Sequence, residues 1–249
     1  MNLLLIESEK INSDGTYIVC DSEKLKHIHE IIKPEIGKEL KTGIINGEIV
    51  KAKIIDIKNT GTSNKQKNIH EIILQISLNE PHLPPPLPIP VTLIIAMQRP
   101  KTLKKILQNA TSMGVKKFYI IEAWKVEKGY WTSSILENST IEKNLLLGLE
   151  QCGDTILPKV FIRKKFKPFV EDELPDISRQ SMSLVAHPYA EGSLPKFVNK
   201  NITLAIGPEG GFTDYEIDKF ENIGFLPVNI GDRILRSEYA VAAILAKLF

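Results

Sequence analysis

The feature that most constrains this chain is a proline-rich stretch at residues 81–90. Six of these ten residues are proline, in the order Pro-His-Leu-Pro-Pro-Pro-Leu-Pro-Ile-Pro. Proline lacks a backbone N–H and fixes φ at about −65°, so such a stretch suits neither a helix interior nor a central strand. We therefore predict a semi-rigid linker at residues 79–90, which separates an N-terminal domain at residues 1–78 from a C-terminal domain at residues 91–249.

Before the linker, short β-type runs alternate with turns. Apolar and β-branched residues gather at 3–6, 17–19, 44–45, 48–57 and 69–76, with glycine and asparagine in the intervening turns. This spacing is typical of a small β-barrel. Within it we expect one helix, capped by Ser22 and continuing through Ile31 and Ile32.

Beyond the linker, β and α patterns alternate. Strands are predicted at 91–97, 117–122, 183–186 and 202–206, and helices at 101–113 and 141–151. Such alternation predicts an α/β domain with a largely parallel sheet.

Composition narrows the functional classes. Hydrophobic residues make up 43% of the chain and charged residues 25%, as in globular proteins with a sizeable core. We expect no transmembrane helix and no signal sequence, and hence a cytoplasmic protein, because every apolar run is far shorter than the roughly 20 residues that span a bilayer. The net charge of +2 is too small to indicate a nucleic-acid partner by itself.

Cysteine and histidine positions predict no metal site. Cys20 and Cys152 are the only cysteines and are far apart in the sequence. The five histidines show no metal-binding spacing, since the closest pair, His27 and His29, would face apart on a helix.

The first glycine-rich motif occupies residues 204–217, with the sequence Leu-Ala-Ile-Gly-Pro-Glu-Gly-Gly-Phe-Thr-Asp-Tyr-Glu-Ile. An apolar strand leads into the glycines, and a helix should follow because Thr213 and Glu216 have the spacing of a capping box. Glycine lets backbone amides approach a ligand closely. The spacing matches neither GxGxxG nor GxxxxGK[ST], and the residues by themselves also suit an ordinary strand-to-helix turn.

The second motif occupies residues 228–240, with the sequence Val-Asn-Ile-Gly-Asp-Arg-Ile-Leu-Arg-Ser-Glu-Tyr-Ala. We expect Ser237 to cap a final helix over 241–249, which leaves Arg233 and Arg236 in the preceding loop. Guanidinium groups after a glycine turn suit contacts with phosphate or substrate, and surface ion pairs are the alternative.

These two motifs, in this order and near the C-terminus, resemble the cofactor loops of the 16S rRNA uracil-N3 methyltransferases, the RsmE family of the SPOUT class. Weaker similarity extends over the whole chain, including 111–115 and 150–153. The resemblance implies a PUA-like N-terminal β-barrel and an α/β C-terminal domain with a trefoil knot, in which the last helix threads a loop. It also implies S-adenosylmethionine as the methyl donor and a homodimer whose active sites borrow from the partner subunit.

Carried over by position, the resemblance places the cofactor among three loops. The residues expected to bind it are Ala186, His187, Pro188, Ile206, Gly207, Pro208, Glu209, Gly210, Gly211, Ile230, Gly231, Ile234, Leu235 and Arg236. The chain departs from the family pattern at Asn109, Asp154 and Tyr239, which lie outside these loops.

Methylation of uracil at N3 concerns a nitrogen that is protonated and weakly nucleophilic at neutral pH. We hypothesise that Arg236, together with Arg233, stabilises the negative charge that develops on the base. Glu238 and Glu209 are candidate bases, although a carboxylate near the start of a helix is equally well explained by the helix dipole.

Two basic clusters are candidates for RNA contact, and an ordinary solvated surface is the alternative for each. One comprises Arg163, Lys164, Lys165 and Lys167, with Phe166 available for base stacking; the other comprises Lys101, Lys104 and Lys105. The expected partner is 16S rRNA or the small ribosomal subunit. A different rRNA or tRNA base, or a non-catalytic role as an RNA-binding ribosome-assembly factor, are the alternative functions.

Overall fold

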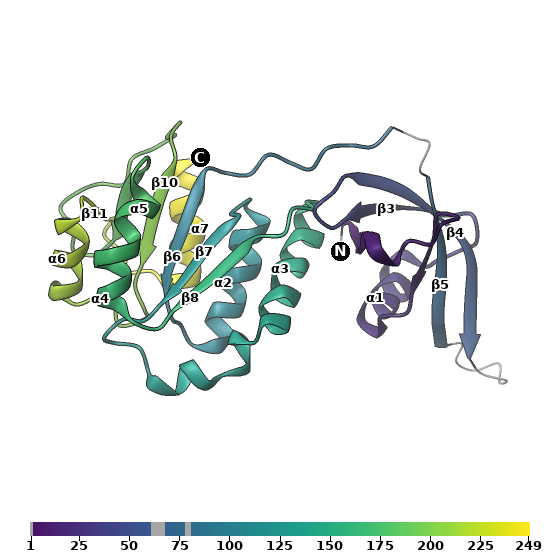
Figure 1. The fold of residues 1–249 in the computed structure, drawn as a ribbon, viewed down its shortest axis with the longest axis horizontal. Helices are drawn as coiled ribbons and strands as arrows, with labels where there is room; N and C mark the ends of the chain where they lie inside the picture. Colours follow the sequence, from purple (N-terminus) through teal and green to yellow (C-terminus); the bar gives the residue numbers. More distant parts are fainter. Residues whose placement is uncertain (1, 61–67, 78–80) are drawn as a thin grey trace. The chain divides into compact units, whose positions relative to one another are not determined.

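The computed structural model describes residues 2–60, 68–77 and 81–249, which form a mixed α/β fold (Figure 1). The chain divides into two compact units. The first comprises Met1–Pro86 and Leu149–Leu157, and the second comprises Leu87–Gly148 and Pro158–Phe249. The chain passes from one unit to the other inside the proline-rich segment, whereas 149–157, assigned from the sequence to the C-terminal domain, packs with the first unit. Residues 79 and 80 of the predicted linker lie outside the described residues.

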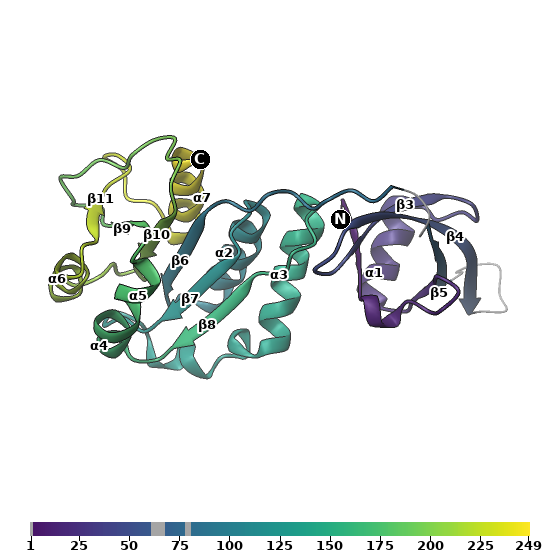
Figure 2. The ribbon, with the colours of Figure 1, turned by 45° about the horizontal axis from the view of Figure 1, so that its top comes forward.

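The first unit is built on a five-stranded sheet with the order β1-β3-β4-β5-β2. Its strands are β1 (Leu4–Ile6), β2 (Thr16–Val19), β3 (Glu39–Ile44), β4 (Ile49–Thr60) and β5 (Asn68–Ile76). The pairs are antiparallel except β1 with β3. The sheet curls around an apolar core that includes Ile28, Ile54 and Leu74 (Figure 2). The expected barrel is thus a curled sheet with β1 and β2 at its edges.

The helix of this unit, α1 (Ser22–His27), continues into a π-helical turn at Ile28–Ile32. Its N-cap is Asp21, whose carboxylate accepts a hydrogen bond from the Lys24 amide at 2.8 Å. The expected cap, Ser22, is instead the first helical residue. Serine and aspartate are both good N-cap residues. Here the Asp21 carboxylate, one position before Ser22, accepts the hydrogen bond from the free amide.

The second unit contains a six-stranded parallel sheet with the order β11-β9-β10-β6-β7-β8. Its strands are β6 (Val91–Ala96), β7 (Lys117–Ile121), β8 (Lys159–Arg163), β9 (Met182–Ala186), β10 (Ile202–Ile206) and β11 (Leu226–Val228). The two strands that the sequence did not predict, β8 and β11, are those at the edges. β8 has charged ends, and β11 has three residues with a central proline, so neither carries a clear strand pattern.

Helices cover both faces of this sheet. Figures 1 and 2 show α2 (Pro100–Ser112), α3 (Asn138–Cys152) and α7 (Ser237–Leu248) on one side, and α4 (Phe166–Pro168), α5 (Leu174–Ser178) and α6 (Asp214–Asn222) on the other. Strand residues such as Ile94 and Val185 pack with Phe169, Phe220 and Phe225 into one buried cluster. Two covered faces explain why β6 and β10 are almost entirely apolar.

The two helices that follow the motifs begin differently. Thr213 and Glu216 form the predicted capping box at α6, with the Thr213 amide donating to the Glu216 carboxylate at 2.8 Å. The N-cap of α7 is Arg236, and no side chain caps this helix, so the expectation that Ser237 is the cap was wrong. Within residues 2–60, 68–77 and 81–249, no helix is long and apolar enough to cross a membrane.

Candidate functional site

A cleft of about 500 Å³ opens at the carboxyl ends of β9, β10 and β11. The loops after these three strands line it, and they are the loops predicted to bind the cofactor. Every residue of that prediction lies in the lining except Gly210. The carboxyl edge of a parallel sheet is where ligand sites form in open α/β folds.

Each glycine of the first loop suits its position for a different structural reason. A Cβ at Gly207 would lie 3.0 Å from the Phe212 amide nitrogen, so the loop turns too tightly for a side chain. Gly211 has φ +71°, and no atom lies within 4 Å of the position of its missing Cβ. Gly210 faces Lys125 instead: a Cβ there would be 3.1 Å from the lysine Cδ, and the lysine Nζ donates to the Gly210 carbonyl at 3.0 Å.

The loop formed by the second glycine motif has open space beside Gly231. Gly231 has φ +139°, and no neighbour lies within 4 Å of the position that a Cβ would take, so it leaves free space beside the backbone. The adjacent Ile234 and Leu235 line the cleft and are 68% and 39% exposed. Such apolar surface at the mouth of a cleft suits a bound molecule or another protein surface.

Gln98 anchors the first loop and was missed from the sequence. It is fully buried, and its Nε2 donates to the carbonyl oxygens of Ala96 at 2.9 Å and Gly207 at 2.8 Å. The residue lies two positions after the end of β6, which pairs with β10, and so it reaches the turn after β10. A polar residue right after an apolar strand was the available signal.

The structure brings the proposed catalytic residues to this one cleft. Arg233, Arg236 and Glu238 all line it. The described residues provide neither a hydrogen bond nor an ion pair for the guanidinium groups of Arg233 and Arg236, so both can engage a ligand. Glu238 is 6% exposed in the first turn of α7, with its Oε1 3.6 Å from the Nζ of Lys105 on α2.

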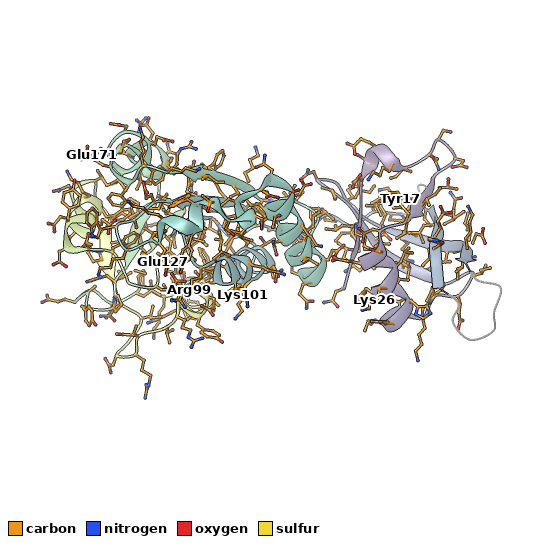
Figure 3. All side chains as sticks on the ribbon, turned by 90° about the horizontal axis from the view of Figure 1, so that it is seen from below. Tyr17, Lys26, Arg99, Lys101, Glu127 and Glu171 are labelled. Atoms are coloured by element: carbon orange, nitrogen blue, oxygen red, sulfur yellow. The ribbon has the colours of Figure 1, made fainter. Side chains whose placement is uncertain are left out.

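Arg99 is a second cleft residue that the sequence reasoning missed. Its backbone amide donates to Glu209 Oε1 at 3.0 Å, and its Nε donates to the Tyr130 hydroxyl at 3.2 Å. The bond to Tyr130, together with the charges of Glu209 and Glu127, raises the pKa of Arg99 further above its already high value. Figure 3 shows Arg99 near Glu127 and Lys101. The cleft therefore has a permanent positive charge on this side.

The two basic clusters proposed for RNA contact lie outside the cleft lining. Lys101 and Lys104 are exposed on α2, whereas Lys105 is drawn to Glu238. Lys101 and Lys104 can therefore contact solvent or a partner from α2, a helix that begins beside the cleft.

The other cluster is only partly available. Arg163 ends β8 and pairs with Glu173 at 2.7 Å, while Lys164 and Lys165 are exposed. Lys167 lies 3.9 Å from Glu171. The expectation that Phe166 is free for base stacking was wrong.

Phe166 is partly buried and packs against the core. Its ring packs against Phe220 and Phe212, with centroids 5.6 and 6.4 Å away. Burial of an aromatic ring stabilises a fold more than its exposure to solvent does. The charged residues around Phe166 in the sequence hide this preference.

The cleft can bind a ligand through backbone groups and guanidinium groups. In the part of the chain that the structure describes, no group of three or more His, Cys, Asp or Glu side chains is placed to hold a metal ion. Asp154, one departure from the family pattern, is buried and accepts a hydrogen bond from the Ile156 amide at 2.9 Å, so it shapes its own turn.

Comparison with known proteins identifies the family. Residues 85–248 match the model of a family described as "RNA methyltransferase domain". "Ribosomal RNA small subunit methyltransferase E" of Treponema pallidum is 26% identical over 250 residues, which cover 99% of this chain and 90% of that protein. "Ribosomal RNA small subunit methyltransferase E 1" of Borreliella burgdorferi is 27% identical, with 98% and 95% covered.

Solved structures share the fold over nearly the whole length. A putative methyltransferase of Legionella pneumophila in complex with the cofactor SAM has a TM-score of 0.71 at 21% identity, covering 98% of this chain and 95% of that one. Ribosomal RNA small subunit methyltransferase E of Neisseria gonorrhoeae, bound to S-adenosyl methionine, has a TM-score of 0.69 at 18% identity, with 99% and 95% covered. Since the family model spans well over half of the chain and the curated relatives cover nearly all of it, this chain belongs to the RsmE family of RNA methyltransferases.

Proposed function

We propose that this protein transfers a methyl group from S-adenosylmethionine to N3 of a uridine in 16S rRNA. The observation that carries the proposal is the single cleft formed by both glycine motifs and the loop after β9, in a chain whose full-length relatives are named small-subunit rRNA methyltransferases. Such a substrate implies action in the cytoplasm, where ribosomal subunits mature.

The cleft fits S-adenosylmethionine in size and chemistry. Its volume of about 500 Å³ lies within the usual range for cofactor sites. Gly211 and Gly231 leave open space beside the backbone, which lets main-chain groups approach the adenine and ribose. Ile230, Ile234 and Leu235 offer apolar contact to the adenine ring. When bound, the cofactor supplies an electrophilic methyl group.

The chain's own task is to hold the uracil and favour loss of its N3 proton. Arg236 and Arg233 are the groups proposed for this, because they line the cleft and no described side chain neutralises them. A guanidinium group donates two parallel hydrogen bonds and stays charged at any physiological pH, so it suits an anionic base or a nearby phosphate.

Glu238 is the proposed proton acceptor. Its carboxylate borders the cleft, and burial among α7 and α2 keeps its position fixed. The Lys105 ammonium, 3.6 Å away, also gives this carboxylate a structural role. Glu238→Gln separates the two: it keeps the shape and most polar contacts of the side chain, so a large loss of kcat with unchanged stability supports proton transfer.

We propose that the finer architecture is also that of the family. The N-terminal unit is proposed to be PUA-like and to present the RNA, and the C-terminal unit to be a trefoil knot with α7 threaded through a loop. A homodimer is proposed because Ile234, Leu235 and Tyr239 expose apolar surface around the cleft. A monomer by sedimentation at micromolar concentration would rule this out.

RNA affinity is assigned to Lys101 and Lys104 on α2 and to Lys164 and Lys165 after β8, all of them exposed. Arg163 and Lys167 contribute less, because each already faces a carboxylate. Reversal of the charge at Lys164 and Lys165 should weaken binding and reduce its salt dependence. Unchanged affinity and salt slope would remove this cluster from the RNA interface.

Methyl transfer from methyl-labelled S-adenosylmethionine tests the function. The purified protein is incubated separately with unmodified small subunits, large subunits and tRNA. Label in the small-subunit rRNA is the expected result. Label in large-subunit rRNA or tRNA would keep the enzyme and change its substrate, and cofactor binding without transfer to any RNA would favour a non-catalytic assembly factor.

A further inference from the structure

The segment that follows β7 contains both tryptophans of the chain, Trp124 and Trp131, as well as Tyr130. Trp124 is 84% exposed, whereas tryptophan is on average a well-buried residue. An exposed indole loses the stabilisation that burial would give, so its position calls for a reason beyond packing.

The turn that carries Trp124 is rigidly held. On one side Ala123 is buried in the core, and on the other Val126 packs against that core and donates to the Ala123 carbonyl at 3.1 Å. The Trp124 amide donates to Glu216 Oε1 at 2.8 Å, and Glu216 is only 2% exposed. The backbone is thus fixed from three directions while the indole itself remains in solvent.

The same segment borders the cleft. Lys125 lies against the glycine loop, with its Nζ bonded to the Gly210 carbonyl and its stem beside the Gly210 Cα. Further along, the Tyr130 hydroxyl accepts a hydrogen bond from Arg99, which lines the cleft. Glu216 links the turn to the capping box that ends the loop. Trp124 is therefore positioned by the elements that shape the cofactor loop.

We propose that Trp124 is a stacking platform for an RNA base that neighbours the target uridine. Single-stranded RNA is recognised largely through unstacked bases that lie on aromatic side chains. An indole on a fixed backbone loses little freedom when a base stacks on it. The two remaining donors of the Lys125 ammonium can meet the phosphate of the same nucleotide.

This inference rests on the proposed RNA substrate and adds a binding residue to it. If the exposed tryptophan instead contacts another protein, its replacement should not change binding to isolated RNA. The test therefore measures RNA binding and methyl transfer separately on the full-length protein.

The test compares Trp124→Ala, Trp124→Phe and a matched control, Phe197→Ala. Phe197 is 79% exposed and does not line the cleft, and its amide bonds to the Lys247 carbonyl near the C-terminal end of α7. Binding is measured with a short single-stranded RNA that has a central uridine. Trp131→Phe makes Trp124 the sole tryptophan, so that stacking is read as fluorescence quenching.

We expect RNA to quench Trp124, and Trp124→Ala to weaken RNA affinity roughly tenfold or more, as for loss of one stacked base. Trp124→Phe should recover most of the affinity, and S-adenosylmethionine affinity should not change in any variant. Unchanged RNA affinity and unchanged KM for small subunits in Trp124→Ala, in a protein that does methylate them, would overturn the stacking role alone. Absence of transfer by the wild-type protein to any RNA would overturn the proposed function as well.

Discussion

Arg236 is the residue on which the proposed chemistry depends most. Its guanidinium group borders the cleft without a described partner, while its backbone carbonyl accepts the amides of Tyr239 and Ala240 at the start of α7. Arg236→Ala should therefore fold normally and lower kcat by about 10²–10³, the usual cost of one group that stabilises developing negative charge. Single-turnover methyl transfer measures this, and calorimetry measures cofactor affinity in parallel.

The control is Arg179→Ala, which removes an exposed arginine paired with Asp176 on α5. It should leave turnover unchanged. Full turnover and unchanged cofactor binding in Arg236→Ala would mean that this arginine has no part in the reaction.

Gln98 holds the Gly207 loop, which we propose to bind the cofactor. Gln98→Met keeps the size of the side chain but leaves two buried carbonyl groups without their donor. The free energy of unfolding should fall by about 2 kcal/mol, and the Kd for S-adenosylmethionine should rise because the loop loses its anchor. Urea denaturation and calorimetry provide the two measurements.

Gln108→Met is the matched control, since Gln108 bonds to Asn144 between α2 and α3, outside the cleft lining. It should lower stability modestly and leave cofactor affinity unaltered. If Gln98→Met were destabilised but bound the cofactor like wild type, Gln98 would be a purely structural residue.

Glu150 makes the stability of the first unit depend on pH. Burial raises the pKa of its carboxyl group, and the Lys24 ammonium 3.8 Å away offsets part of that effect. Because the folded-state pKa is raised, this group's contribution to stability is fully present below its unfolded pKa of about 4.3. It is lost as the pH rises through the folded-state value.

Glu150→Gln removes this titration. Relative to wild type, the variant should gain stability between pH 4 and pH 7, as measured by urea unfolding across that range. A wild-type protein that gains stability relative to Glu150→Gln over this range would contradict the raised pKa.

At the scale of elements, α2 and α3 pack closely together at Gly148. A Cβ there would lie 2.6 Å from the Gln108 carbonyl oxygen and 2.8 Å from Thr111 Cβ. Gly148→Ala should therefore destabilise the protein by about 1–3 kcal/mol, although alanine is the better helix former by about 1 kcal/mol. Thermal or urea unfolding measures the change.

Gly129→Ala is the control, because nothing lies within 4 Å of a Cβ at that position. It should be close to neutral. A Gly148→Ala protein as stable as wild type would show that the helices separate at little cost.

The element pattern was largely predictable, because buried parallel strands are continuous apolar runs and the helices between them are periodic. The strands missed in the second unit, β8 and β11, are short edge strands; β8 has a charged residue at each end and β11 contains a central proline. The helix starts show a different limit. Asp21 and Ser22 are both good capping residues, and backbone geometry decides which one caps α1, while at α7 the N-cap position falls on Arg236, one residue before Ser237.

The parts of the candidate site that lie in the glycine motifs could be predicted from the sequence. The parts that strand pairing brings together could not. Gln98 and Gly207 are 109 positions apart and meet only because β6 pairs with β10. Arg99 and the turn at Trp124 likewise reach the first glycine loop through strand order. Phe166 was misassigned because its charged neighbours in the sequence mask a ring that packs into the core.

At the scale of the whole molecule, two compact units share one chain that crosses between them at Pro86–Leu87 and again at both ends of 149–157. The second unit contains the complete cleft. The proposed cofactor binding and methyl transfer therefore need only residues of the second unit, and our proposal gives RNA presentation to the first unit.

The most direct test is mass spectrometry of nucleosides from unmodified small ribosomal subunits after incubation with the protein and S-adenosylmethionine that carries a trideuterated methyl group. We expect trideuterated N3-methyluridine, formed by wild type and strongly reduced with Arg236→Ala. A trideuterated methyl group on any other nucleoside, or none despite measured cofactor binding, would contradict the proposed function.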